Sequence, residues 1–99
     1  MIIGTTPTHE FTIPSELSEF NEIHIIYAQN DKIVLLKTKE DCTIEENKIS
    51  VQLTQDETFR FDPEEDVYIQ VRLLIGREAL SSGIVRVKCQ KCLETEILK

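Results

Sequence analysis

Cysteine is the residue type in this chain that comes closest to forming a chemical motif. Cys89 and Cys92 stand three positions apart, a spacing at which two thiolates can bind one face of a tetrahedral zinc ion or form a redox pair. A structural zinc site needs four ligands, and the remaining soft donors, Cys42, His9 and His24, do not form a second close pair. The alternatives are an intrachain zinc site, a zinc or disulfide shared between subunits, and inert thiols, and the sequence favours inert thiols.

The position and number of the cysteines also bear on redox chemistry. A thioredoxin-like role is disfavoured because Cys89 follows the last expected strand instead of opening a helix. Three cysteines are an odd count, which indicates reduced thiols in a reducing compartment and not a secreted disulfide framework. Residues 1–4 lack the basic segment and the long apolar run of a signal peptide, so we expect a cytoplasmic product.

Other residue types give no catalytic pattern. His9 and His24 stand near no obvious nucleophile, and a surface or interface role is the better interpretation for both. The serines lack a nucleophile-elbow context, and three glycines are too few for a phosphate-binding loop. The acidic run at residues 62–66 lacks the alternation and glycine of a calcium-binding loop, which favours a solvated loop. We expect no enzyme activity, no catalytic residue and no cofactor.

The overall composition limits the class of protein and its partners. A chain of 99 residues is expected to form one domain over residues 1–99, and 40% hydrophobic with 29% charged residues is typical of a globular protein. The formal charge of -7 disfavours binding to nucleic acid or to anionic lipid. No apolar run approaches the roughly 20 residues that cross a membrane.

The elements that must position these residues show a period of two. Ile23, Ile25 and Tyr27 fall on one face of a strand, and the pair Asn30 and Asp31 then suits a two-residue hairpin turn. A capping box from Thr54 to Glu57 predicts a single helical turn. Strands are expected at residues 11–14, 22–28, 32–38, 41–44, 48–53, 67–75 and 84–89, with an edge segment at 79–82, a connector at 15–21 in which Leu17 and Phe20 plug the core, and a tail at 93–99.

This pattern predicts an all-β fold, an immunoglobulin-like β-sandwich of about seven antiparallel strands in two sheets. Doubly apolar strands indicate burial on both sides or an oligomer interface, and burial is the more frequent outcome. The side chains expected to contact a partner are Tyr27, Tyr68, Leu36 and Leu74.

Three stretches, residues 27–34, 51–58 and 67–74, together resemble a phage module, the immunoglobulin-like domain that begins bacteriophage baseplate upper proteins. The shared features are a strand pair around a polar turn, a strand that ends in Leu-Thr before an acidic capped turn, and a long alternating strand. The similarity covers about residues 9–89, and the whole chain is also similar to small uncharacterised prophage-encoded proteins. The chain departs from the baseplate family by lacking a downstream receptor-binding region and by carrying Cys89 and Cys92 near its end.

The resemblance implies a non-enzymatic structural protein of a phage or prophage that acts through protein–protein contacts. Its implied partners are other phage structural proteins or further copies of itself. Its implied location is the bacterial cytoplasm during expression and includes the virion. The alternative hypothesis is a small metal- or thiol-responsive regulator that uses Cys89 and Cys92.

Overall fold

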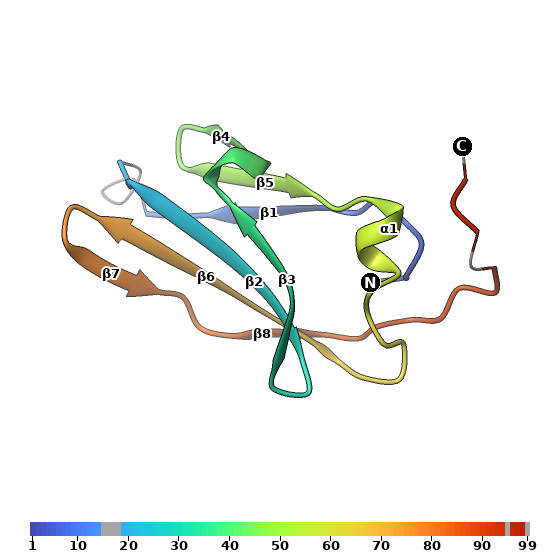
Figure 1. Ribbon diagram of the computed structural model, residues 1–99. Coiled ribbons are helices and arrows are strands. Elements are labelled where there is room, and N and C mark those ends of the chain that lie inside the picture. The colour runs from blue at the N-terminus through green and yellow to red at the C-terminus, as the bar shows by residue number, and fades with distance from the viewer. Residues whose placement is uncertain (15–18, 95, 99) are drawn as a thin grey trace.

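The computed structural model describes residues 1–14, 19–94 and 96–98, and these residues form two antiparallel sheets packed face to face (Figure 1). The expectation of an all-β fold in two sheets is confirmed, with eight strands in place of about seven. The strands are β1 (Thr8–Thr12), β2 (Glu22–Gln29), β3 (Lys32–Thr38), β4 (Cys42–Glu45), β5 (Lys48–Gln52), β6 (Val67–Ile75), β7 (Glu78–Ser81) and β8 (Val85–Val87). The described residues also include the helical turns η2 (Lys39–Asp41) and α1 (Gln55–Thr58).

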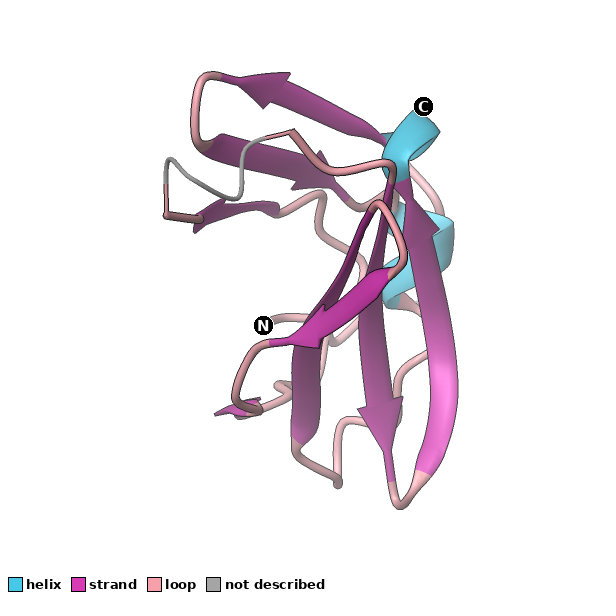
Figure 2. Ribbon diagram, turned by 90° about the vertical axis from the view of Figure 1, so that its left-hand side faces the viewer, coloured by secondary structure: helices cyan, strands magenta, loops and turns pink. Residues whose placement is uncertain are grey.

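The two sheets differ in size. The smaller sheet has the order β1-β5-β4, and the larger has the order β3-β2-β6-β7, with β8 pairing to β6 beside β7. Figure 2, viewed from the end that carries the turn between β6 and β7, shows the sheets as separate layers. Consecutive strands therefore do not always pair, because β1 pairs with β5 and β2 pairs with β6.

The hairpin between β2 and β3 forms where the sequence predicts it. Asn30 and Asp31 adopt φ values of 49° and 61°, which is the signature of a turn with two left-handed residues. Such a turn has the twist of the strands that it joins, so it fixes the register of the pairs next to it, and an irregularity between Tyr27 and Ala28 then shifts the register of the rest of the hairpin. Ile23, Ile25 and Tyr27 then face the core with no exposed surface.

The capping box at α1 is also confirmed. The side chain of Thr54 accepts the Glu57 backbone N–H at 3.1 Å, and the Glu57 carboxylate accepts the Thr54 N–H at 2.9 Å. These bonds satisfy two donors that a helix start leaves unpaired. The helix is a single turn, as expected. Thr58 at its end is buried, and its hydroxyl accepts the Gly4 N–H and donates to the Thr5 carbonyl of the N-terminal segment.

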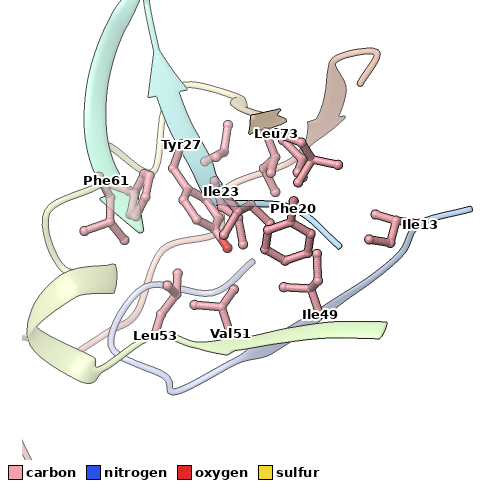
Figure 3. Packing of buried hydrophobic residues seen from close by; sticks show 14 of the residues in the cluster. Ile13, Phe20, Ile23, Tyr27, Ile49, Val51, Leu53, Phe61 and Leu73 are labelled. Carbon is pink, nitrogen blue, oxygen red and sulfur yellow. The ribbon is translucent and has the colours of Figure 1, made fainter. Parts of the chain in front are cut away.

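The core lies between the sheets, and its buried strand residues come from β2, β3, β5 and β6. Tyr27 and Ile23 from β2 face Val51 on β5 and Leu53 just beyond it (Figure 3). Phe20 of the expected connector is buried beside them, with 6% of its surface exposed. Leu17, the other residue expected to plug the core, lies outside the described residues.

The strand boundaries near the chain ends correct the sequence-based expectations. The first strand begins at Thr8 and not at Phe11, because Pro7 already accepts a ladder hydrogen bond from Leu53 at 3.0 Å. The last strand ends at Val87 instead of Cys89. Beyond it, Ile2 and Gln90 form a parallel bridge that ties the N-terminal segment to this end of the sheet.

The edge of the larger sheet is interrupted between β7 and β8. Both strands pair with the same side of β6, but the register shifts by one residue between them. At the break, the Ser82 hydroxyl accepts the Val71 N–H at 3.0 Å and the Ser82 N–H donates to the Val71 carbonyl at 2.8 Å. This local detour leaves Ile84 and Val85 with 63% and 56% of their surfaces exposed.

Candidate functional site

The structure does not bring the three cysteines into one site. Cys42 begins β4, whereas Cys89 and Cys92 follow β8, and all three are half-buried and unbridged. Among the described residues, no group of three or more His, Cys, Asp or Glu side chains is placed to hold a metal ion. Burial raises the pKa of the Cys42 and Cys89 thiols, which keeps them protonated and less reactive.

His9 is half-buried on β1, on the side that faces the core. Its Nδ1 lies 2.7 Å from the Tyr27 hydroxyl, and the two rings are tilted at a centroid distance of 5.6 Å. Burial, helped by the nearby N-terminal ammonium group, lowers the pKa of His9, so the imidazole is neutral at pH 7. Burial likewise raises the pKa of the Tyr27 hydroxyl, so the hydrogen bond between His9 and Tyr27 joins two neutral groups.

The expected contact residues fall into two groups. Tyr27 is fully buried, and this corrects the expectation that it contacts a partner, because its ring fills the space between the sheets and its hydroxyl is bonded to His9. Leu36 and Tyr68 lie on the outer face of the larger sheet, where they are 43% and 39% exposed. Leu74 is half-buried on the same face, so these three residues stay candidates for contact.

His24 lies on that outer face as well, opposite Thr38 on β3 and Arg72 on β6.

The acidic run at residues 62–66, which follows α1, is held in place through its backbone. The buried side chain of Gln29 donates to the carbonyls of Asp62 and Glu65 at 2.7 and 3.1 Å and accepts the Asp62 N–H at 2.8 Å. These bonds hold the acidic loop against the end of β2.

A groove that sequence analysis missed lies between the edges of the two sheets. Its volume is about 560 Å³, and it runs between β1 on one side and the broken β7–β8 edge on the other. Apolar side chains dominate its walls, and Glu10 is the one charged residue that lines it among the residues that the structure describes. The lining residues used below are Glu10, Phe11, Thr12, Ile13, Ile84 and Val85.

The β1 edge that borders this groove has unpaired backbone groups. Hydrogen bonds from Leu53 to Pro7 and from Ile13 to Asn47 show that the odd-numbered residues of β1 direct their N–H and C=O groups toward β5. By alternation, Thr8, Glu10 and Thr12 direct theirs away from β5. Over residues 1–14, 19–94 and 96–98, no strand pairs with this outer side of β1.

No sequence signal marks this site, because it depends on which strands end up at the sheet edges. Phe11 and Ile13 show only the alternation of an ordinary strand. Gly83 permits a bend, and it lies between β7 and β8, but a glycine at this position does not by itself say that a groove lies beside it.

The known protein families and the curated proteins contain no match to this chain. Solved structures do match. One is the immunoglobulin-like domain of mouse leukocyte-associated immunoglobulin-like receptor 1 in a strand-swapped dimer, with a TM-score of 0.55 and 10% identity over 90% of this chain and 85% of that chain. Another, of the extracellular domain of the same mouse receptor, also a strand-swapped dimer, gives a TM-score of 0.55 and 8% identity over 90% and 83% of the two chains.

The fold is an immunoglobulin-like β-sandwich. This confirms the fold expected from the strand pattern. At this level of identity the similarity concerns the fold alone, so the function of the groove has to be argued from its own residues. Among the described residues, no helix is long and apolar enough to cross a membrane.

Proposed function

We propose that this chain is a non-enzymatic protein–protein binding module that accepts an extended strand from a partner along the open edge of β1. The observation that carries the proposal is the unpaired side of β1 next to an apolar groove. Strand addition at a sheet edge uses main-chain hydrogen bonds for affinity and alternate side-chain positions for specificity. The outward N–H and C=O groups of Thr8, Glu10 and Thr12 supply the main-chain hydrogen bonds, and the groove receives the side chains.

The exposed apolar residues at the groove support the same function. Ile84 and Val85, which line the groove, are apolar and yet more than half exposed. A strand laid between them and β1 would remove their surfaces from water, which is favourable at about 25 cal/mol per Å² of apolar area. An edge that stays open is also a hazard for aggregation, so a bound strand protects the fold as well.

The identity of the partner class rests on two further supports. Both similar receptor structures are strand-swapped dimers, which supports a further copy of the chain as a partner. The resemblance of residues 9–89 to the first domain of baseplate upper proteins supports a structural role in a phage or prophage, with the virion as its place of action. No observation favours the metal- or thiol-responsive alternative, since the pKa of the Cys89 thiol is raised.

A proline at Glu10 tests the proposal. The Glu10 N–H points away from β5, so Glu10→Pro removes an edge donor without breaking a bond of the internal ladder. The matched control is Leu36→Glu, which alters the outer face of the larger sheet. Each variant is co-expressed with the proteins encoded beside its gene, and complexes and self-association are measured by size-exclusion chromatography with light scattering.

We expect wild type and the Leu36→Glu variant to form a complex of defined mass and Glu10→Pro to lose it. Equal binding by Glu10→Pro would place the binding surface elsewhere. Loss with Leu36→Glu alone would assign it to the outer face that carries Leu36 and Tyr68. If wild type forms neither a homo-oligomer nor a complex, the binding-module proposal is wrong.

A further inference from the structure

We infer that the strand that fills the groove is β1 of a second copy, paired antiparallel with β1 about a two-fold axis that passes between the two Phe11 residues. This inference rests on the proposed function and specifies its partner and register. The two small sheets would then join into one continuous sheet with the order β4-β5-β1-β1-β5-β4. Such a contact uses the same surface of both copies, as a two-fold dimer requires.

The direction of the backbone groups limits the registers that are possible. Thr8, Glu10 and Thr12 carry the free N–H and C=O groups, so an even-numbered residue must face an even-numbered residue of the second copy. Pairing Glu10 with Glu10 of the second copy would place two carboxylates directly opposite each other, which is unfavourable. That register is therefore excluded on charge.

A register that pairs Glu10 with Thr12 of the second copy avoids this repulsion. Each Glu10 then exchanges both backbone hydrogen bonds with a threonine, and the arrangement is repeated by the two-fold axis. Pairing Glu10 with Thr8 instead would shift the overlap toward residues 6–7, away from the groove, whose β1 wall runs over residues 10–14. Pairing Thr12 with Thr12 would place Glu10, in the middle of β1, opposite Pro14, which has no N–H to donate. In the chosen register Pro14 faces only Thr8, the first residue of β1, so the lost bonds lie at the two ends of the strand pair.

The chosen register also matches the apolar side chains. Phe11 faces Phe11 of the second copy at a close, non-hydrogen-bonded position, where cross-strand aromatic pairs are favourable. Phe11 and Ile13 are on the inward side of β1 and line the groove, so the same residues of the second copy enter it beside Ile84 and Val85. The exposed apolar surface of the broken β7–β8 edge is covered as a result.

The charge distribution favours this occupant over an acidic foreign strand. Among the described residues, Glu10 is the one charged side chain that lines the groove. In the inferred register each Glu10 carboxylate lies directly opposite a threonine of the second copy, and the two Glu10 side chains are only diagonal neighbours. No like charges therefore lie directly opposite each other in the strand pair.

Thr12→Lys tests the register by gain of affinity. The new lysine lies opposite Glu10 of the second copy, and the two-fold axis creates two such pairs, so the dimer dissociation constant should fall about 2- to 30-fold. The matched control is Thr43→Lys, the same substitution at an exposed threonine of β4, the opposite edge of the small sheet, and it should leave the constant unchanged. Dissociation constants are measured by sedimentation equilibrium up to about 500 μM protein.

Phe11→Cys in a background with Cys42, Cys89 and Cys92 changed to serine gives a second test. At the inferred position the two Cα atoms lie about 4.5 Å apart, within the range that a disulfide spans, so mild oxidation should give a covalent dimer. Thr43→Cys in the same background should not cross-link. Because Phe11 packs against the core, this variant has to be checked for folding, and the lysine pair remains decisive if it fails.

The outcomes separate this inference from the proposed function. A wild-type protein that stays monomeric, while a neighbouring gene product binds it in a Glu10-dependent way, overturns the second copy as occupant and leaves strand binding intact. A dimer that Thr12→Lys does not strengthen overturns the register. If neither a dimer nor any partner complex forms, both the inference and the binding-module proposal fail together.

Discussion

Replacement of Glu57 by glutamine is expected to destabilise the domain more than replacement of Lys37 by methionine. The Lys37 ammonium lies 2.6 Å from the Glu57 carboxylate, and the two side chains are only 10% and 16% exposed. Lys37 is on the inward side of β3 and Glu57 is in α1, so this ion pair ties the edge of the larger sheet to the capped turn. Partial burial alone would raise the pKa of Glu57, but the hydrogen bonds from Lys37 and Thr54 outweigh it and lower that pKa.

The expected magnitudes differ because the two partners have different second contacts. Glu57→Gln keeps an amide oxygen for the Thr54 N–H but leaves the Lys37 charge buried beside a neutral group, at a cost of about 2–4 kcal/mol. Lys37→Met removes the buried charge and keeps the length of the side chain, while Glu57 retains its cap and some solvent, at about 1 kcal/mol. The double variant should lie within about 1 kcal/mol of wild type, which corresponds to a coupling of about 2–4 kcal/mol.

Thermal and urea unfolding, followed by circular dichroism, measure all four proteins of this cycle. A loss of about 2 kcal/mol in a domain of this size lowers the Tm by about 8–16 °C, so the Glu57→Gln effect is well above the error of the measurement. Addition of salt to about 1 M should change the coupling little, since a buried pair is poorly screened. Two single effects below about 0.5 kcal/mol that add without coupling would show that solvent screens the pair and would refute the reasoning.

Two more predictions concern the histidine and the cysteines. Because burial lowers the pKa of His9 in the folded state, its contribution to stability is complete above about pH 6.5 and is lost as the pH falls through the lowered pKa. The Tm of wild type should therefore fall between pH 7 and pH 5, whereas His9→Asn should show a flatter profile, and an unchanged profile would mean that His9 does not titrate in this range. Changing both Cys89 and Cys92 to serine should alter stability by no more than about 1 kcal/mol and leave the self-association unchanged. Purified wild type should contain less than about 0.1 zinc per chain by elemental analysis, and stoichiometric zinc would restore the metal-responsive hypothesis.

Local features of the fold were predictable from the sequence because they depend on neighbours in the chain. The turn at Asn30 and Asp31 needs only two residues that tolerate positive φ, and the capping box at Thr54 and Glu57 needs only its two side chains. The alternation of residues 67–75 likewise identified the inward face of β6.

The candidate site was not predictable, because it depends on contacts between distant parts of the chain. Tyrosine is a residue type that is common at interfaces, so the sequence suggested a partner contact for Tyr27. Only the packing of Tyr27 between the sheets and its hydrogen bond to His9 place it in the core. Lys37 reads as a surface charge, yet the register of β3 turns it inward to meet Glu57. In both cases the partner comes from an element at least 18 positions away.

The sequence by itself determined the strand period, the turn types and the capped helical turn, because backbone sterics and short-range hydrogen bonds set these over a few residues. Only the tertiary structure decided which strand edges stay open. β1 is an edge strand because β5 pairs with one of its sides and, among the described residues, no strand pairs with the other. The β7–β8 edge is interrupted because Ser82 forms hydrogen bonds with Val71 at the register shift. The groove between them exists only after both sheets have paired and packed, since strand order depends on long-range contacts that local patterning does not encode.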